Sequence, residues 1–102
     1  MEAFDVRDCE PLEWSDLWAA MDEAWRNGSR EWFPTTENQF DAMLGAVPPR
    51  LMGGGGFLCG EPWTHDSAGR GVYAEFVRLT GGRYAARYST AEQFRATCPS
   101  AV

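Results

Sequence analysis

The sequence predicts a single α+β domain that spans residues 1–102, because helix-like stretches come first and strand-like stretches follow. Apolar residues recur at helical spacing in two stretches of the first half, over 11–27 and 36–47. Three β-type runs, separated by turn residues, follow at 57–61, 72–79 and 83–88. A chain of 102 residues has room for one hydrophobic core. We therefore expect two helices packed on one face of a three-stranded, mainly antiparallel sheet, with a short C-terminal helix.

The first helix is expected to begin at Pro11, since proline fits the first helical turn. It should end at Asn27-Gly28, because glycine readily takes the left-handed conformation of a helix cap. Five large apolar residues share one stripe of this helix: Trp14, Leu17, Trp18, Met21 and Trp25. We expect this stripe, with its three tryptophans, to enter the core.

Two other helices are marked by capping signals. Thr36 and Gln39 have the spacing of a capping box, which predicts a helix start there. Pro48-Pro49 should end that helix, because the residue before a proline is pushed out of the α region. Ser89-Thr90, followed by Glu92-Gln93, predicts the short C-terminal helix that carries Phe94.

Glycines 53–56 raise the question of a phosphate-binding loop. Such a loop leads into the amino end of a helix and carries a lysine. Here the glycines follow a helix and precede a strand, and the chain has no lysine. We therefore expect a flexible connector.

The runs 72–79 and 83–88 are expected to form a hairpin around a two-residue turn, Gly81-Gly82. That register places three arginines on one face of the hairpin: Arg78, Arg83 and Arg87. Its tyrosines then point to the other, apolar face, where Glu75 also falls without an evident partner. An RNA-binding sheet shows aromatic and basic residues on the same face. We therefore expect a solvated face, or an arginine patch that pairs with an acidic helix.

The cysteines and the one histidine show no catalytic or metal-binding pattern. Cys9, Cys59 and Cys98 are odd in number and far apart, which favours reduced thiols in a cytoplasm. A zinc site needs three or four ligands at paired spacings, and Cys59 with His65-Asp66 offers too few. We expect no metal, no cofactor, no membrane segment and no enzyme; an enzyme that uses Cys59 and His65 is a lesser alternative.

The net charge of −6 is unevenly distributed along the chain. Residues 1–66 hold thirteen acidic residues against four arginines, a net charge of −9, whereas residues 67–102 carry +3. Such a surface repels nucleic acid and favours a basic partner, although acidic helices often serve only solubility. The candidate partner-binding residues are Glu10, Glu13, Asp16, Glu23, Glu31, Glu37 and Asp41.

Two tryptophans outside the helices, Trp32 and Trp63, lie near prolines in connecting segments. Exposed aromatic residues in such segments often anchor a partner. Packing at the edge of the core is the expectation that we favour for both.

The segment from Phe40 through Pro49, together with Val77-Arg78-Leu79 and Gly82-Arg83-Tyr84, resembles a proteobacterial family of unknown function carried on plasmids and phages. The resemblance covers residues 40–88, with Ala85-Ala86 in place of the family's usual aromatic and hydroxyl residues. It implies a mobile genetic element. In size and acidity the chain also resembles anti-CRISPR proteins.

Together these features predict a non-catalytic protein that inhibits a host defence complex in the bacterial cytoplasm. Its acidic face would occupy a basic nucleic-acid-binding surface, such as that of a CRISPR effector. The alternative is an accessory or homodimeric domain, such as a plasmid-borne regulator.

Overall fold

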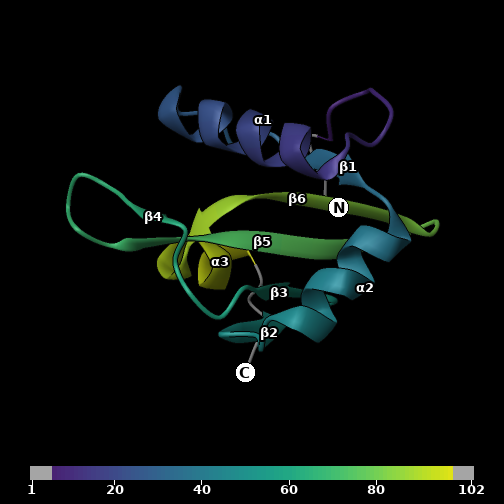
Figure 1. The fold of residues 1–102 in the computed structure, drawn as a ribbon. Coiled ribbons are helices and arrows are strands. Elements are labelled where there is room, and N and C mark those ends of the chain that lie inside the picture. The colour runs from purple at the N-terminus through teal and green to yellow at the C-terminus, as the bar shows by residue number, and fades with distance from the viewer. Residues whose placement is uncertain (1–5, 98–102) are drawn as a thin grey trace.

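A computed structural model describes residues 6–97 and confirms the α+β class. In Figure 1 helix α1 lies above an antiparallel sheet, helix α2 lies at its lower right, and helix α3 lies behind β5. The strand order is β1-β6-β5-β3-β2, and β4 pairs with the start of β5. The six described strands show that the expected three-stranded sheet was too small. The elements are α1 Trp14–Arg26, β1 Phe33–Thr35, α2 Glu37–Ala46, β2 Leu51–Gly53, β3 Gly56–Leu58, β4 Thr64–His65, β5 Gly71–Leu79, β6 Arg83–Thr90 and α3 Ala91–Thr97.

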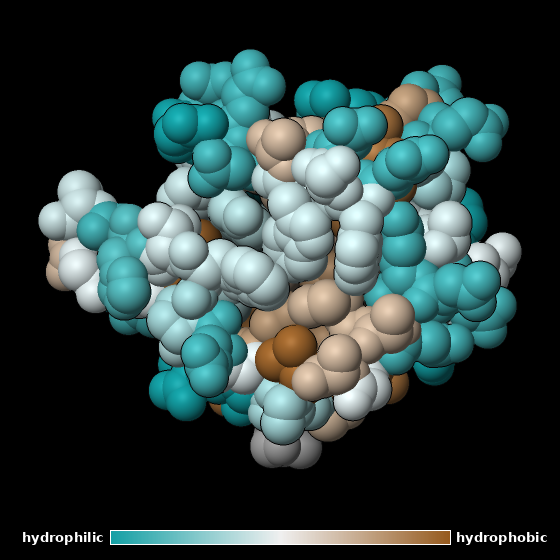
Figure 2. Space-filling model, in the orientation of Figure 1, coloured by the Kyte–Doolittle hydropathy of each residue, from teal (hydrophilic) through white to brown (hydrophobic). Residues whose placement is uncertain are grey.

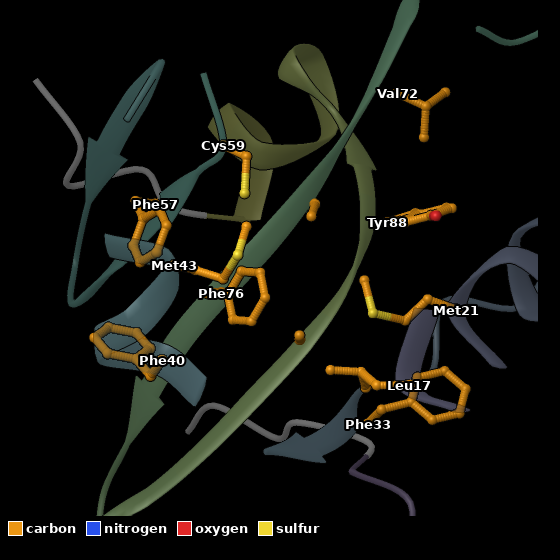
Figure 3. Packing of buried hydrophobic residues seen from close by; sticks show 12 residues of the cluster. Leu17, Met21, Phe33, Phe40, Met43, Phe57, Cys59, Val72, Phe76 and Tyr88 are labelled. Atoms are coloured by element: carbon orange, nitrogen blue, oxygen red, sulfur yellow. The ribbon is translucent and has the colours of Figure 1, made fainter. Parts of the chain in front are cut away.

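The main core lies between the sheet and helices α1 and α2 (Figure 3). Leu17 and Met21 of α1 pack at the β6 side, whereas Phe40 of α2 packs at the β3 side. Phe57 of β3 joins the two parts, because its ring stacks on Phe76 of β5 at 5.7 Å between centroids. Burial of these large side chains supplies most of the driving force for folding.

Helix α1 begins at Trp14, three residues later than the sequence predicts. The reason lies in the backbone of Leu12, whose carbonyl accepts a hydrogen bond from the Gln39 side chain at 2.9 Å and so ties this segment to α2. The helix ends as expected: Gly28 has φ +78°, and the amide of Ser29 bonds to the carbonyl of Ala24.

The apolar stripe of α1 enters the core only in part. Leu17 and Met21 are fully buried, whereas Trp18 and Trp25 are half-buried. Trp14 keeps 39% of its surface exposed. The prediction that all three tryptophans are core residues was therefore wrong for Trp14, whereas Trp18 and Trp25 do pack against the core.

Both predicted caps are present. The amide of Gln39 bonds to Thr36 Oγ1 at 3.0 Å, and the Gln39 side chain accepts from the amide of Thr36 at 2.9 Å. Thr90 and Gln93 exchange the same pair of bonds at the start of α3, at 3.0 and 3.1 Å. Phe94, the apolar residue of that helix, is fully buried.

The glycine run forms a tight hairpin, where the sequence had suggested a flexible connector. Gly53 pairs with Gly56, and the two turn glycines between them have positive φ values of +33° and +88°. Gly56 also has no room for a side chain, because a Cβ there would lie 2.7 Å from Cγ1 of Val77. Glycine is thus needed at this turn for its backbone and for its size.

The β5–β6 hairpin has a three-residue loop, since Leu79 pairs with Arg83. One extra loop residue shifts the pairing of β6 with β5 by one position. Residues of β6 that were predicted to share a face with a given set of β5 residues therefore lie on the opposite face of the sheet. Arg78 therefore lies on the helix-covered face, with its guanidinium 5.4 Å from the Phe40 ring centroid. Arg87 lies on the other face and is buried, so the predicted shared face of Arg78, Arg83 and Arg87 does not exist.

The second face of the sheet holds a small apolar cluster and a polar one. Trp32, only 2% exposed, packs there with Val77, Leu79 and Ala85. Glu75, which had no evident partner in the sequence, lies directly opposite Arg87 and forms an ion pair with it.

Candidate partner-binding surface

The acidic side chains predicted to bind a partner lie mostly at one corner of the molecule. Asp16 occupies the first turn of α1, and Glu37 the first turn of α2. The two helix starts are held together by the bond from the Gln39 side chain to the Leu12 carbonyl. We call this region the acidic corner, with the members Glu10, Glu13, Asp16, Glu37 and Asp41, all of them exposed.

The carboxylates of the acidic corner form no ion pair with any residue in the range 6–97. Each helix start also presents partial positive charge from its free amides, which stabilises acids in the first turn. Asp16 and Glu37 therefore stabilise the starts of their helices. The carboxylate oxygens of the acidic corner remain open to an external cation.

The other two candidates lie away from this corner. Glu23 is exposed one turn before the end of α1, seven residues after Asp16 and on the same side of the helix. Glu31 follows α1 and forms an ion pair with Arg7 at 2.9 Å. That bond raises the pKa of Arg7 above its ordinary value, and the guanidinium also lies 4.5 Å from the Phe33 ring centroid. Glu31 is thus already engaged within the chain.

A column of three tryptophans forms beside the acidic corner. The rings of Trp14 and Trp18 lie 5.7 Å apart between centroids, and those of Trp18 and Trp63 lie 4.5 Å apart. Trp18 connects the column to the core through contacts with Phe76 and Tyr88. Trp63 is half exposed, so the predicted packing at the edge of the core is only partial for this residue. Trp32 is buried. We refer to Trp14, Trp18 and Trp63 as the tryptophan column.

A hollow of about 640 Å³ opens next to Trp63. It lies between the end of α2 and the segment that follows β3, and most of its lining is apolar. Arg50 and Glu61 are its charged lining residues, and the apolar ones include Val47, Pro48, Pro49 and Pro62. The middle of this side of the molecule, between α1 and α2, shows pale and brown side chains with teal ones around them (Figure 2).

Sequence reasoning missed this column because it assigned Trp14 and Trp18 to the core. The spacing held no signal to separate the surface tryptophan from the core residues, because all five apolar side chains fall within one stripe of ordinary width.

Cys59 and His65 do not form a reactive pair in the described part of the chain. Cys59 is fully buried, and burial raises the pKa of its thiol to about 11. His65 lies in the short strand β4 with its side chain exposed. A protonated, buried thiol is a poor nucleophile.

Within residues 6–97 no group of three histidine, cysteine or acidic side chains is placed to hold a metal ion. Cys9 is an exposed free thiol and Cys59 a buried one, and Cys98 lies outside the described residues. None of the helices in the described range is both long and apolar enough to cross a membrane.

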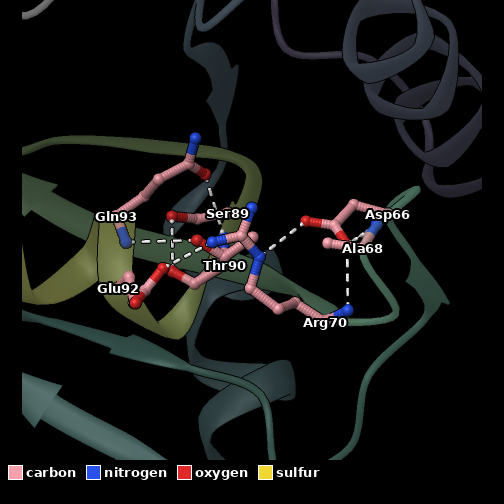
Figure 4. A network of polar contacts seen from close by, with 7 residues as sticks. All are labelled: Asp66, Ala68, Arg70, Ser89, Thr90, Glu92 and Gln93. Carbon is pink, nitrogen blue, oxygen red and sulfur yellow. Dashed lines mark hydrogen bonds and ion pairs between the residues drawn. The ribbon is translucent and has the colours of Figure 1, made fainter.

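The loop between β4 and β5 contains a polar network with a structural role (Figure 4). Asp66 accepts hydrogen bonds from the amides of Ala68 and Arg70 and from the Arg70 side chain. The bond from the Arg70 amide contributes most to lowering the pKa of Asp66. Arg70 also reaches Glu92 of α3 at 2.7 Å, so this network ties the loop to the C-terminal helix.

No known protein family, curated protein or solved structure matches this chain. The resemblance of residues 40–88 to a family of plasmids and phages thus stays a prediction.

Proposed function

We propose that this chain is a non-catalytic protein from a mobile genetic element that binds and inhibits a host defence complex of the CRISPR kind. The acidic corner and the outer side of α1 would occupy a basic surface that normally holds nucleic acid. The mobile-element part of this proposal rests on the resemblance of residues 40–88 and on the chain's size and acidity.

The observation that carries the proposal is that these acids form no ion pair within the described residues. In the range 6–97, the carboxylates of the acidic corner and of Glu23 form no ion pair, although arginines elsewhere pair with Asp22, Glu31, Asp66, Glu75 and Glu92. Carboxylates one or two turns apart on a helix form a row of negative charge. Such a row can pair with the arginines and lysines that bind phosphates.

The burial of Cys59 favours a binding role over catalysis by this thiol, because a buried thiol with a raised pKa is a poor nucleophile. The alternative is an accessory or homodimeric domain. The exposed rings of Trp14 and Trp63 favour that alternative, since exposed aromatic surface also supports self-association.

The test is capture of a partner from a host lysate with tagged protein, followed by titration of the captured partner at low and high salt. Binding should weaken steeply with salt, because a Debye length of about 10 Å at 0.1 M shortens to about 3 Å at 1 M. The double reversal Asp16→Arg with Glu23→Arg should weaken binding further and slow association.

The matched control is Asp8→Arg with Thr80→Arg and Ala96→Arg, which changes the net charge equally at exposed sites outside the candidate surface. The control should bind like the wild type in high salt and only slightly worse in low salt. A partner that binds equally at both salt concentrations, and that tolerates the reversal of Asp16 and Glu23, would show that the acidic surface serves only solubility.

A further inference from the structure

Within residues 6–97, no arginine lies over a ring of the tryptophan column. Four arginines in residues 6–97 do lie over aromatic rings, and those rings belong to Phe33, Tyr73, Phe40 and Trp32. Trp14 and Trp63 each form a ring contact with Trp18, and the Trp63 side chain also hydrogen-bonds with the Cys59 thiol. They remain 39% and 50% exposed. Tryptophan offers the most favourable ring face for a cation.

An acidic residue precedes each outer tryptophan of this column in the sequence. Glu13 immediately precedes Trp14 and belongs to the acidic corner. Glu61, two residues before Trp63, lines the hollow and is exposed. Neither carboxylate forms an ion pair within residues 6–97. Arg50, the other charged residue of the hollow, lies 5.7 Å from the Tyr73 ring centroid. This charge pattern is complementary to a cationic side chain that also has a flat face.

The hollow beside Trp63 adds an apolar site next to that cation site. Its volume of about 640 Å³ is within the range of roughly 300–1,000 Å³ typical of ligand sites. Three prolines and Val47 provide an apolar part of its walls, which suits proline or an aliphatic residue of an extended segment. Such a segment can place alternate side chains on the column and in the hollow.

We propose that the tryptophan column and the hollow bind an extended, arginine-bearing segment of the partner protein. An arginine guanidinium stacks on the exposed face of Trp63 or Trp14 and pairs with Glu61 or Glu13, while an apolar neighbour fills the hollow. This inference rests on the proposed function, because it names the chemistry by which the basic partner is recognised. Arginine is specified over lysine, since its planar guanidinium stacks on a ring and pairs with a carboxylate at the same time.

The test uses two synthetic peptides, repeats of Pro-Pro-Arg and of Pro-Pro-Lys, which share an extended conformation and the same charge. Binding is measured by calorimetry, and contact is located from the indole N–H signals of isotope-labelled protein. The signals are assigned with the variants Trp14→Phe and Trp63→Phe. The matched control is Met52→Ala, which removes another exposed apolar side chain, 60% exposed, away from the column.

We expect the arginine peptide to shift the Trp14 and Trp63 indole signals and to bind roughly two- to fivefold tighter than the lysine peptide. Trp63→Ala should weaken its binding by about threefold or more, whereas Met52→Ala should leave it unchanged. Circular dichroism of each variant checks that the fold is retained.

Three outcomes would overturn the inference. Equal binding of both peptides, lost on reversal of Asp16 and Glu23, would leave the proposed function standing and remove the role of the column. Absence of peptide binding would also reject the column as an arginine site, while the salt-dependent capture described above still decides the proposed function separately. A wild-type dimer in sedimentation that Trp63→Ala dissociates would show that the column holds a second copy of this chain.

Discussion

Glu75 and Arg87 lie directly opposite each other on β5 and β6, and Arg87 Nε is 3.4 Å from Glu75 Oε1. Both side chains are buried, and the Arg87 guanidinium also lies 3.9 Å from the Trp32 ring centroid. Arg87 donates a further hydrogen bond to the carbonyl of Arg30, whose own guanidinium bonds to the carbonyl of Tyr88 at 2.6 Å. This polar cluster connects the sheet to the segment between α1 and β1.

The first prediction concerns the pH dependence that Glu75 gives to stability. Burial raises the pKa of Glu75 above its ordinary value of 4.5, against the opposing effects of Arg87 and Arg30. The folded state therefore holds this proton more tightly than the unfolded state does. The contribution of Glu75 to the free energy of unfolding is fully present below about pH 4.5, and it is lost as pH rises through the raised pKa of this group.

The variant Glu75→Gln cannot lose that proton. Because glutamine resembles the protonated carboxyl, the unfolding free energies of wild type and variant should differ least at low pH. As pH rises through the raised pKa of Glu75, the wild type should lose stability relative to the variant. Urea titrations of both proteins across this pH range measure the difference, and Glu61→Gln, at an exposed site, provides the control. A wild type that gains stability relative to the variant as pH rises would mean that the pair with Arg87 dominates over burial.

The second prediction separates the two kinds of residue in the α1 stripe. Leu17→Ala should lower the free energy of unfolding by about 2–5 kcal/mol, because Leu17 is fully buried. Trp14→Ala should cost less than about 1.5 kcal/mol, since its described ring contact is one aromatic pair with Trp18. Urea midpoints of the two variants decide the matter, and equal losses would mean that Trp14 is a core residue after all.

The third prediction compares two glycines. Gly56→Ala should destabilise the fold by about 1–3 kcal/mol, because its new Cβ would meet Val77 Cγ1 at 2.7 Å and the Phe76 carbonyl oxygen at 2.8 Å. Gly45→Ala, in α2 with open space around it, should stabilise by about 0.5–1 kcal/mol. Thermal unfolding of both variants tests the close packing of the β2–β3 hairpin against β5. An unchanged melting temperature for Gly56→Ala would show that Gly56 does not lie this close to Val77.

The fourth prediction concerns thiol reactivity. In a Cys98→Ser background, Cys9 should react rapidly with a thiol reagent, because it is exposed. Cys59 should react only on unfolding, since it is buried and its pKa is raised to about 11. Variants that keep only Cys9 or only Cys59 identify each signal. Rapid labelling of Cys59 in the folded protein would reopen the alternative of a catalytic thiol.

Local signals in the sequence determined much of this structure. The capping boxes at Thr36 and Thr90, the helix stop at Gly28 and the long hairpin strands are all where the sequence predicts them. Each of these features is decided by residues within a few positions of one another. Hydrogen bonds over such short separations need no tertiary context.

The tertiary structure decided the rest, because the missing information lay in contacts between distant segments. Strands β1 and β2 contain only three residues each and exist through pairing with β6 and β3. The loop length at Gly82 set the register, and with it the pairing of Glu75 with Arg87. The acidic charge of residues 1–66 could be predicted from the sequence, since charged residues can be counted without a structure. The tryptophan column could not, because Trp63 contacts Trp18 only when a segment 45 residues away in the sequence packs against α1.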